Sequence, residues 1–326
     1  MSLQQTFIDE MAVLFGGDKE KESCFRHRFH PAKHPDNNKD DREKAQNTAI
    51  AKLIDDDLPW TYCQKNIGHT IRRVLEVLCR EYGEEMKADG VPVELLFSVG
   101  RGGVLLVNNN GDAAEEENQQ QPQGKFSPWQ IVYRWLWDKK FLRFLWENWQ
   151  EKADANKSWI EICKDEEIPA VLSKPRGLML EELEEAREES LPTITLKQSQ
   201  RLVVFFPQET RGYFLLLNKG NNGSCVLCPS LGFAVNCSVN SKIILPQKEA
   251  LAGEKKIGFK YGDLGIEEFI AIAHPQPLTL PWLDVSNKKG EIAPVLTSDR
   301  LLELWEELEK QGQWRAYYQA FEVVEV

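Results

Sequence analysis

One cysteine and three histidines lie close together near the amino terminus, in a C-x2-H-x2-H-x3-H arrangement: Cys24, His27, His30 and His34. Thiolate and imidazole groups are the ligands that zinc prefers in proteins. A four-ligand zinc site usually joins two ligand pairs across a longer loop, however, and Pro31 and Pro35 interrupt any helix that could gather all four side chains. The simpler interpretation of residues 18–41 is therefore a polar, solvated loop. If a metal ion is bound, we expect its ligands to be Cys24, His30 and His34.

A second cysteine pair, Cys225 and Cys228, has the C-x2-C spacing of zinc knuckles and redox motifs. The pair falls in a predicted strand, where alternation sends residues three apart to opposite faces. No second C-x2-C follows, and Cys237 alone cannot complete a four-ligand site, so we interpret the pair as two packed thiols. All seven cysteines are an odd number on a long chain, which favours free thiols in a reducing compartment.

Enzyme signatures are missing from the sequence. It contains no G-x-S-x-G, no H-E-x-x-H and no Walker loop. The acidic triplet at 55–57, together with His69, leaves a metal-dependent hydrolase open as an alternative, although such a triplet after a helix is typical of a cap and a turn. We expect a non-catalytic protein without a cofactor.

Predicted helices over 41–54 and 66–86, followed by a β-hairpin over 93–108, have the order of a winged-helix DNA-binding domain. In that alternative, Arg72, Arg73 and Arg101 would contact nucleic acid. Basic and acidic residues nearly cancel in this region, and the whole chain carries 51 acidic against 40 basic residues, a net charge of -11. An excess of Lys and Arg strengthens binding to the phosphate backbone of nucleic acid, so the negative net charge of this chain disfavours a nucleic-acid partner.

An unusually aromatic helix is predicted from Phe126 to Trp149, opened by Ser127 as N-cap and Pro128 at the first helical position. Its apolar residues cluster on two nearly opposite faces, so we expect the helix to be covered on both sides or broken near Asp138. The alternative is an exposed protein-interaction surface, since tryptophans often anchor interfaces. Its candidate residues are Trp135, Trp137, Trp146 and Trp149.

Placed in order, these segments predict an α+β protein with five parts. Residues 1–108 form a mostly helical domain with one β-hairpin, 109–125 a flexible linker or loop, and 126–190 the aromatic-rich helical segment, with helix continuing through 153–163. Seven short apolar runs within 191–280, among them 256–261, predict an antiparallel β-sandwich or barrel, with a hairpin turn at Asn222-Gly223. Residues 281–326 are expected to form carboxy-terminal helices, including one over 314–321.

With no signal sequence and no stretch of 18 apolar residues, we expect a cytoplasmic protein that does not bind a membrane.

The segment from about residue 196 to 277 resembles a bacterial β-rich domain family of unknown function. The resemblance rests on LKQSQRLVV, GYFLLLNKGNNGSCVLCPS, KIILP and IEEFIAIAHPQP, which are strands and turns. Members accompany caspase-like peptidases or kinases in bacterial conflict and signalling systems. The resemblance therefore implies a non-catalytic interaction or regulatory protein, whose partner is a protein such as a caspase-like peptidase or a kinase. The amino-terminal 190 residues resemble no family.

Overall fold

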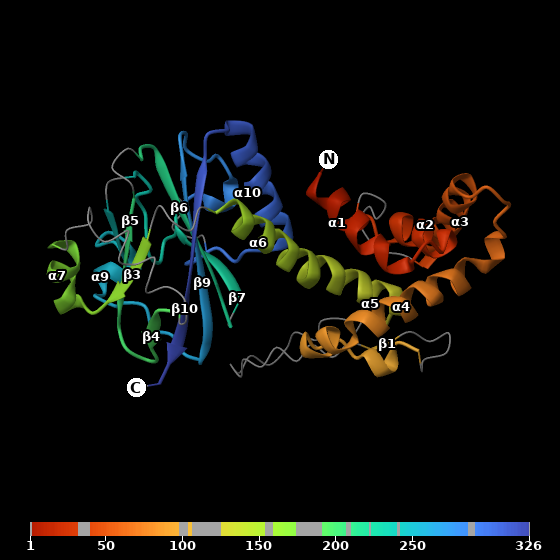
Figure 1. The fold of residues 1–326 in the computed structure, drawn as a ribbon, viewed down its shortest axis with the longest axis horizontal. Coiled ribbons are helices and arrows are strands. Elements are labelled where there is room, and N and C mark those ends of the chain that lie inside the picture. Colours follow the sequence, from red (N-terminus) through yellow and green to blue (C-terminus); the bar gives the residue numbers. More distant parts are fainter. Residues whose placement is uncertain are drawn as a thin grey trace. The chain divides into compact units, whose positions relative to one another are not determined.

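The computed structural model describes residues 2–31, 40–97, 104–105, 125–153, 159–173, 191–206, 210–221, 223–239, 242–285 and 291–325. They divide into two compact units, Met1–Phe144 and Leu145–Val326 (Figure 1). The division falls inside the aromatic-rich helix, whereas the linker predicted at 109–125 lies outside the described residues except for Lys125. Among the helices described, none combines the length and the apolar composition needed to cross a membrane.

The amino-terminal unit is helical. Its α-helices are α1 (Leu3–Ala12), α2 (Lys19–Arg28), α3 (Asp40–Asp57), α4 (Ile67–Ala88) and α5 (Pro128–Trp135), with short 3-10 turns η1 (Val13–Phe15), η3 (Gln64–Asn66) and η4 (Val93–Leu95). The helices predicted over 41–54 and 66–86 are confirmed as α3 and α4. The apolar stripe of α4, including Ile71, Val74 and Leu78, is buried because the amphipathic pattern turns it toward the unit's core.

Helix α2 corrects the loop expected over 18–41. Asp18 caps it, accepting a hydrogen bond from the backbone N–H of Lys21 at 3.2 Å. Phe25 and Phe29 are fully buried and stack on each other, with ring centroids 5.2 Å apart. The charged composition hid this helix, because Cys24 and Phe25 are its only apolar residues.

The β-hairpin predicted over 93–108 is also wrong. Residues 93–95 form the 3-10 turn η4, and the strand β1 (Val104–Leu105) pairs antiparallel with the distant β2 (Lys125–Phe126). The Gly-rich segment at 100–103 lies outside the described residues. In the described residues of this range, 93–97 and 104–105, the two strands of the wing that the winged-helix alternative requires are therefore not paired with each other.

The aromatic-rich helix runs through α5, the π-helical turn η5 (Leu136–Lys140) and α6 (Phe141–Lys152). Ser127 opens it: its backbone N–H donates to the Gln130 side chain at 2.9 Å in a capping box. The π-helical turn contains Asp138, where the sequence predicts a break. A π-turn rotates the helix faces, which explains why the two apolar clusters do not share one stripe.

The carboxy-terminal unit contains two open sheets. The larger has the order β4-β10-β9-β6-β7, from β4 (Thr193–Thr195), β6 (Tyr213–Gly220), β7 (Gly223–Cys228), β9 (Gly265–His274) and β10 (Arg315–Val324). Its pairs are antiparallel except β4 with β10. The smaller has the order β3-β5-β8, from β3 (Trp159–Cys163), β5 (Arg201–Phe205) and β8 (Lys242–Leu245). The predicted α+β sandwich is thus confirmed, and the described strands do not close into a barrel.

Apolar side chains fill the space between the two sheets. Leu202 and Val204 of β5 pack in one cluster with Phe214 and Leu216 of β6. Helices cover the outer faces: α10 (Ser298–Gln311) and the end of α6 lie over the larger sheet, and α7 (Ile168–Ser173) lies over the smaller one (Figure 1). The remaining short helices are η6 (Asp165–Glu167), α9 (Leu251–Glu254) and η7 (Pro281–Leu283).

Three predictions for this unit are wrong. A helix was expected over 314–321, but residues 315–321 belong to strand β10. Helix was also expected to continue through 153–163, but residues 159–163 form β3. Residues 256–261, expected as a strand, make only an isolated bridge between Gln200 and Phe259. Strand β10 is covered on both faces, so its sequence lacks the alternation of polar and apolar residues that marks a half-exposed strand.

We expect Trp149→Ala to lower the free energy of unfolding of the carboxy-terminal unit by about 3–5 kcal/mol. Trp149 is fully buried, and its ring makes an edge contact with Trp305 at 4.9 Å, so truncation leaves a cavity. Urea unfolding followed by circular dichroism measures the change. Trp60→Ala is the matched control, since Trp60 is 48% exposed, and equal effects of the two substitutions would contradict the packing described here.

Candidate functional site

The described metal-ligand candidates near the amino terminus, Cys24 and His30, do not belong to an assembled metal site. Cys24 lies inside the core, where burial raises the pKa of its thiol to about 12, so it is protonated at neutral pH. His30 follows α2, and His34 lies outside the described residues. Within the described part of the chain, no three His, Cys, Asp or Glu side chains are placed to hold a metal ion.

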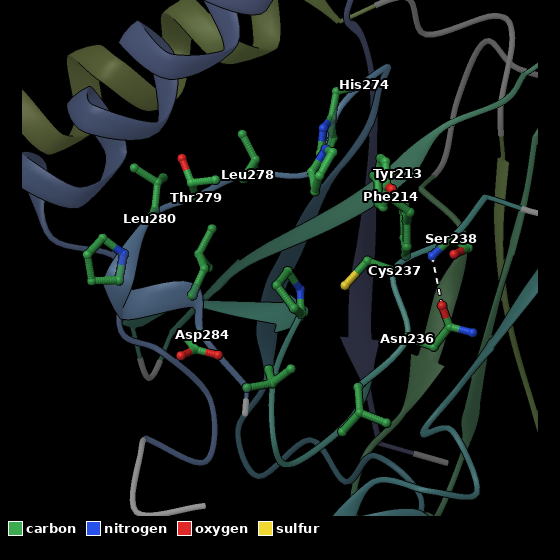
Figure 2. Close-up of a pocket in the computed structure, with 16 residues that line it drawn as sticks. Tyr213, Phe214, Asn236, Cys237, Ser238, His274, Leu278, Thr279, Leu280 and Asp284 are labelled. Atoms are coloured by element: carbon green, nitrogen blue, oxygen red, sulfur yellow. Dashed lines mark hydrogen bonds between the residues drawn. The ribbon is translucent and has the colours of Figure 1, made fainter. Parts of the chain in front are cut away.

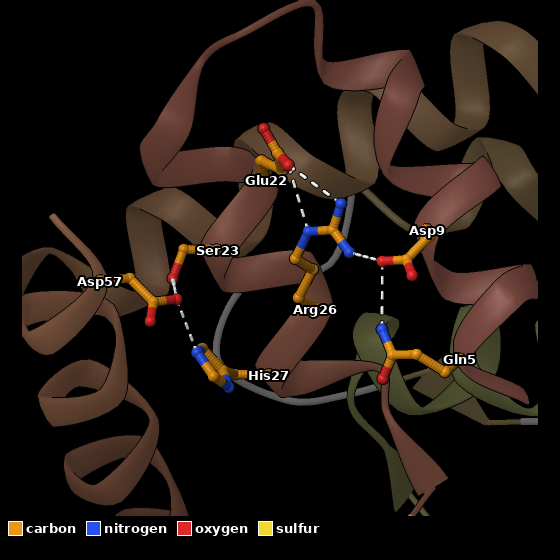
Figure 3. A network of polar contacts seen from close by, with 7 residues as sticks. All are labelled: Gln5, Asp9, Glu22, Ser23, Arg26, His27 and Asp57. Atoms are coloured by element: carbon orange, nitrogen blue, oxygen red, sulfur yellow. Dashed lines mark hydrogen bonds and ion pairs between the residues drawn. The ribbon is translucent and has the colours of Figure 1, made fainter. Parts of the chain in front are cut away.

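Asp57 of the acidic triplet joins α3 to α2. Its carboxylate accepts a hydrogen bond from Ser23 Oγ at 2.6 Å and contacts His27 Nε2 at 2.8 Å (Figure 3). In a serine hydrolase the histidine stands between the serine and the carboxylate, whereas here the carboxylate stands between the other two. Beside it, Arg26 binds Asp9 and Glu22. This network ties helices together and does not form a nucleophile with its base.

The arginines of the nucleic-acid alternative are engaged with acidic side chains. Arg72 pairs with Glu76 at 3.2 Å, one turn along α4. Arg73 pairs with Asp18 at 2.6 Å and with Glu20 at 3.5 Å. Arg101 lies outside the described residues. The two described arginines therefore sit among carboxylates, which would repel phosphate.

The four tryptophans of the predicted interaction surface are buried, which corrects that prediction. Trp135 donates to Asp89 at 2.7 Å, and Trp137 donates to the backbone carbonyl of Phe29 at 2.8 Å. Trp146 donates to Glu268 at 3.3 Å, and Trp149 packs on Trp305 and Trp314. The side chains serve the cores of their own units. Trp135, Trp137 and Trp146 have hydrogen-bond acceptors there, whereas Trp149 contributes only ring contacts, since its Nε1 is buried without a partner among the described residues.

A pocket of about 570 Å³ lies in the carboxy-terminal unit, beside the start of β6 and the end of β9 (Figure 2). Three segments form its wall: Tyr213 and Phe214 of β6 with His274 of β9, residues 235–238, and residues 277–285. A second hollow of about 430 Å³ shares Val235, Asn236 and Ser238 with it and reaches β8. The two hollows therefore adjoin along residues 235–238.

Local backbone features place the wall. The segment 237–239 pairs with the beginning of β6, through Phe214 N to Cys237 O at 2.6 Å and Val239 N to Gly212 O at 2.9 Å. Beyond β9, three prolines within 275–281 prevent a regular strand or helix from continuing, and the chain runs along the pocket until η7. Apolar side chains such as Leu278, Leu280 and Leu283 consequently line it.

The electrostatics of the pocket are simple. Burial lowers the pKa of His274, so its ring is neutral at pH 7. Its Nδ1 lies 2.7 Å from the carbonyl oxygen of Gln276, which can only accept, so Nδ1 carries the hydrogen and Nε2 is left as an acceptor. Asp284 is the only Asp, Glu, Lys or Arg among the residues that line the pocket. The wall thus combines apolar surface with one negative charge.

Cys237 also lines the pocket, and its side chain packs against the core cluster that contains Cys228. The ring of His274 is directed instead to Gln276 and stacks on Tyr213, with centroids 5.9 Å apart. The contacts recorded for these two side chains therefore do not join them as a nucleophile and its base. Cys237 and His274 are therefore not arranged as a Cys-His catalytic pair.

Sequence reasoning missed this pocket. Its wall joins residues 213–214, 235–238, 274 and 277–285, which meet only through sheet pairing. The weak signal was the proline-rich run after β9, which the family resemblance treated as the end of a strand.

The argument from strand alternation, which placed Cys225 and Cys228 on opposite faces, was also incomplete. A register shift opposite Leu216 and Leu217 breaks the alternation, and both thiols pack against the same core cluster.

Acidification should weaken the fold through His274. Below its ordinary pKa of 6.5 the unfolded chain binds a proton at this residue, while the folded chain, with its lowered pKa, does not. The free energy of unfolding should therefore fall as the pH drops below 6.5, by up to about 1.4 kcal/mol per pH unit, until the folded pKa is reached. Urea unfolding at several pH values measures how the free energy of unfolding depends on pH, and we expect His274→Gln to remove the part of this dependence that comes from His274. Glu267, whose pKa burial raises, changes the free energy of unfolding in the opposite direction. Its contribution is the same in both proteins and cancels in the comparison. An unchanged slope in the variant would contradict the burial of a neutral ring.

Comparison with known proteins gives no relative for this chain: no family model, curated protein or solved structure matches it.

Proposed function

We propose that this protein is a non-catalytic interaction protein whose carboxy-terminal unit binds an extended segment of a partner protein in the pocket beside β6. The observation that carries the proposal is the pocket wall, which is apolar apart from a few polar groups and the single carboxylate of Asp284. Pockets of 300–1,000 Å³ with a few placed polar groups are typical binding sites.

The wall defines the chemistry of the segment. The leucines within 278–283 can contact one large apolar side chain of the partner. Burying that side chain would contribute about 1.5–3 kcal/mol to the free energy of binding. Asp284, which is exposed at the wall, favours a neighbouring Lys or Arg. The adjoining hollow along 235–238 extends the surface, which suits an extended peptide better than a compact small molecule. We therefore propose a basic-apolar peptide segment as the occupant.

The engaged polar groups support a non-catalytic role. Asp57 is bound to Ser23 and His27, and the Cys24 thiol is protonated. The family resemblance of residues 196–277 adds caspase-like peptidases and kinases of bacterial signalling systems as the partner class to examine first.

Selection of short random peptides displayed on phage against the full chain tests the proposal. We expect enrichment of sequences that carry a large apolar residue beside Lys or Arg. Fluorescence anisotropy of an enriched peptide should show about tenfold weaker binding to Leu278→Asp, since apolar burial is lost. Asp284→Asn should bind a few times more weakly and with a smaller salt dependence.

Glu322→Gln is the control for charge, because Glu322 is exposed on β10 and does not line the pocket. Its affinity should equal that of the unaltered chain. Peptides that bind equally well to Leu278→Asp and Asp284→Asn, or a selection without enrichment, would overturn the pocket as the binding site. Turnover on a panel of hydrolase substrates would overturn the non-catalytic role.

A further inference from the structure

Two cysteines meet on the same edge of β6. Cys228 ends β7, which pairs with the carboxyl-terminal half of β6, and its Sγ lies 3.7 Å from the carbonyl oxygen of Phe214. The chain then leaves the edge and returns to it at Cys237, whose carbonyl accepts from the N–H of the same Phe214 at 2.6 Å. The two thiols consequently flank one residue of β6, and Cys228 Sγ also lies 4.0 Å from the carbonyl oxygen of Asn236, the residue next to Cys237.

The turn between them holds the two cysteines in place. Ser230 and Ala234 close it with a pair of backbone hydrogen bonds of 2.8 and 3.1 Å. The side chain of Gln247 brackets Asn236, accepting from its N–H at 2.9 Å and donating to its carbonyl at 2.6 Å. Because these hydrogen bonds already order the turn, a bond between the two cysteines would cost little additional conformational entropy.

The two thiols differ in access. Cys228 is fully buried in the cluster between the sheets. Cys237 is part-buried and lines the pocket between Asn236 and Ser238 (Figure 2). A small reagent that enters the pocket reaches Cys237 first, with Cys228 directly behind it.

The two thiols also differ in acidity. The side-chain contact with Cys228 lowers the pKa of the Cys237 thiol, and this effect outweighs burial, which raises it. Burial raises the pKa of Cys225 and of Cys79 to about 11, and that of Cys24 to about 12. Of these four cysteines, Cys237 is the one with the larger fraction of thiolate, which is the reactive form.

We propose that Cys237 and Cys228 are a thiol-oxidation site that a small hydroperoxide converts reversibly into a disulfide. The Cys237 thiolate attacks the hydroperoxide, forming an S–O bond and breaking the O–O bond, and an alcohol or water leaves once the departing oxygen takes up a proton. Cys228 then attacks the resulting sulfenic acid, the S–O bond breaks, and water leaves with the Cys228 proton. The two cysteines together lose two electrons, which the hydroperoxide accepts.

This inference revises the interpretation of these cysteines as inert packed thiols. The disulfide would link residues 228 and 237 and remove a thiol from the pocket wall, so the redox state would alter the surface that a ligand meets. It does not rest on peptide binding, because every measurement below uses the protein alone with thiol reagents. Its failure and the failure of the proposed function are therefore separate results.

Alkylation of the reduced full chain by iodoacetamide tests the acidity and the access. At neutral pH we expect Cys237 to react about tenfold faster than Cys225, since its larger thiolate fraction outweighs its lower intrinsic nucleophilicity. The pH at which Cys237 is half reactive should rise in Cys228→Ala, which removes the donor, and stay low in Cys228→Ser, whose hydroxyl still donates. Equal rates at Cys237 and Cys225, or an identical shift in both variants, would overturn the proposal.

Oxidation by a stoichiometric amount of hydrogen peroxide tests the bond itself. Trypsin releases one peptide, residues 220–242, that contains Cys225, Cys228 and Cys237, and chymotrypsin cuts within it after Leu227 and Phe233. Mass spectrometry should then find the fragments of Cys228 and Cys237 joined, and free again after dithiothreitol. Cys225→Ala is the matched control and should give the same joined fragments.

The outcomes are decisive in both directions. A joined Cys228–Cys237 pair that dithiothreitol reverses supports the proposal, and in Cys228→Ala the sulfenic acid on Cys237 should persist and be trapped by dimedone. Oxidation confined to Cys63, which is exposed, or a bond between two protein molecules, would overturn it.

Discussion

The pairing of β6 along both of its edges is the constraint on which the carboxy-terminal unit depends. One edge pairs with β9 from Tyr213 to Lys219. The other edge is divided between β7 and the segment 237–239. Because backbone groups in the interior must all find partners, the chain after β7 has to return to this edge after its turn. That return creates the pocket wall and places Cys237 beside Cys228.

A part-buried carboxylate secures the helix layer over the same sheet. Glu268 of β9 accepts hydrogen bonds from Trp146 and Gln150 of α6 and from Tyr318 of β10, and it pairs with Lys219 of β6 at 2.6 Å. A charge removed from water is tolerated only when partners of this kind surround it. Burial and the bond to Glu268 raise the pKa of Tyr318, which keeps the phenol protonated as a donor. The aromatic residues of α6 therefore position the helix, and their role in the fold accounts for their abundance.

The proposed binding and the proposed thiol chemistry depend on different features of the same geometry. The apolar wall from 277–285 depends on prolines that stop regular structure just after β9. The contact between the thiols depends on a register shift in the pairing of β7, which turns Cys228 into the core beside Leu227. Neither feature requires a residue of unusual type, so neither has a motif that marks it in the sequence.

What the sequence determined by itself is local. Helices α1, α3, α4 and α10, the break in the aromatic helix, and most strands of the carboxy-terminal unit follow from periodicity, caps and turn residues, because those signals act within a few residues along the chain. Tertiary structure alone decided that 315–324 is a strand, since its nine-residue pairing with β9 outweighs any local helical preference. It likewise decided that Phe25 and Phe29 stabilise a helix in a charged segment, and that residues 213, 237, 274 and 284 line one pocket. These outcomes depend on contacts between residues far apart in the chain, whose free energy is gained only when the whole unit folds.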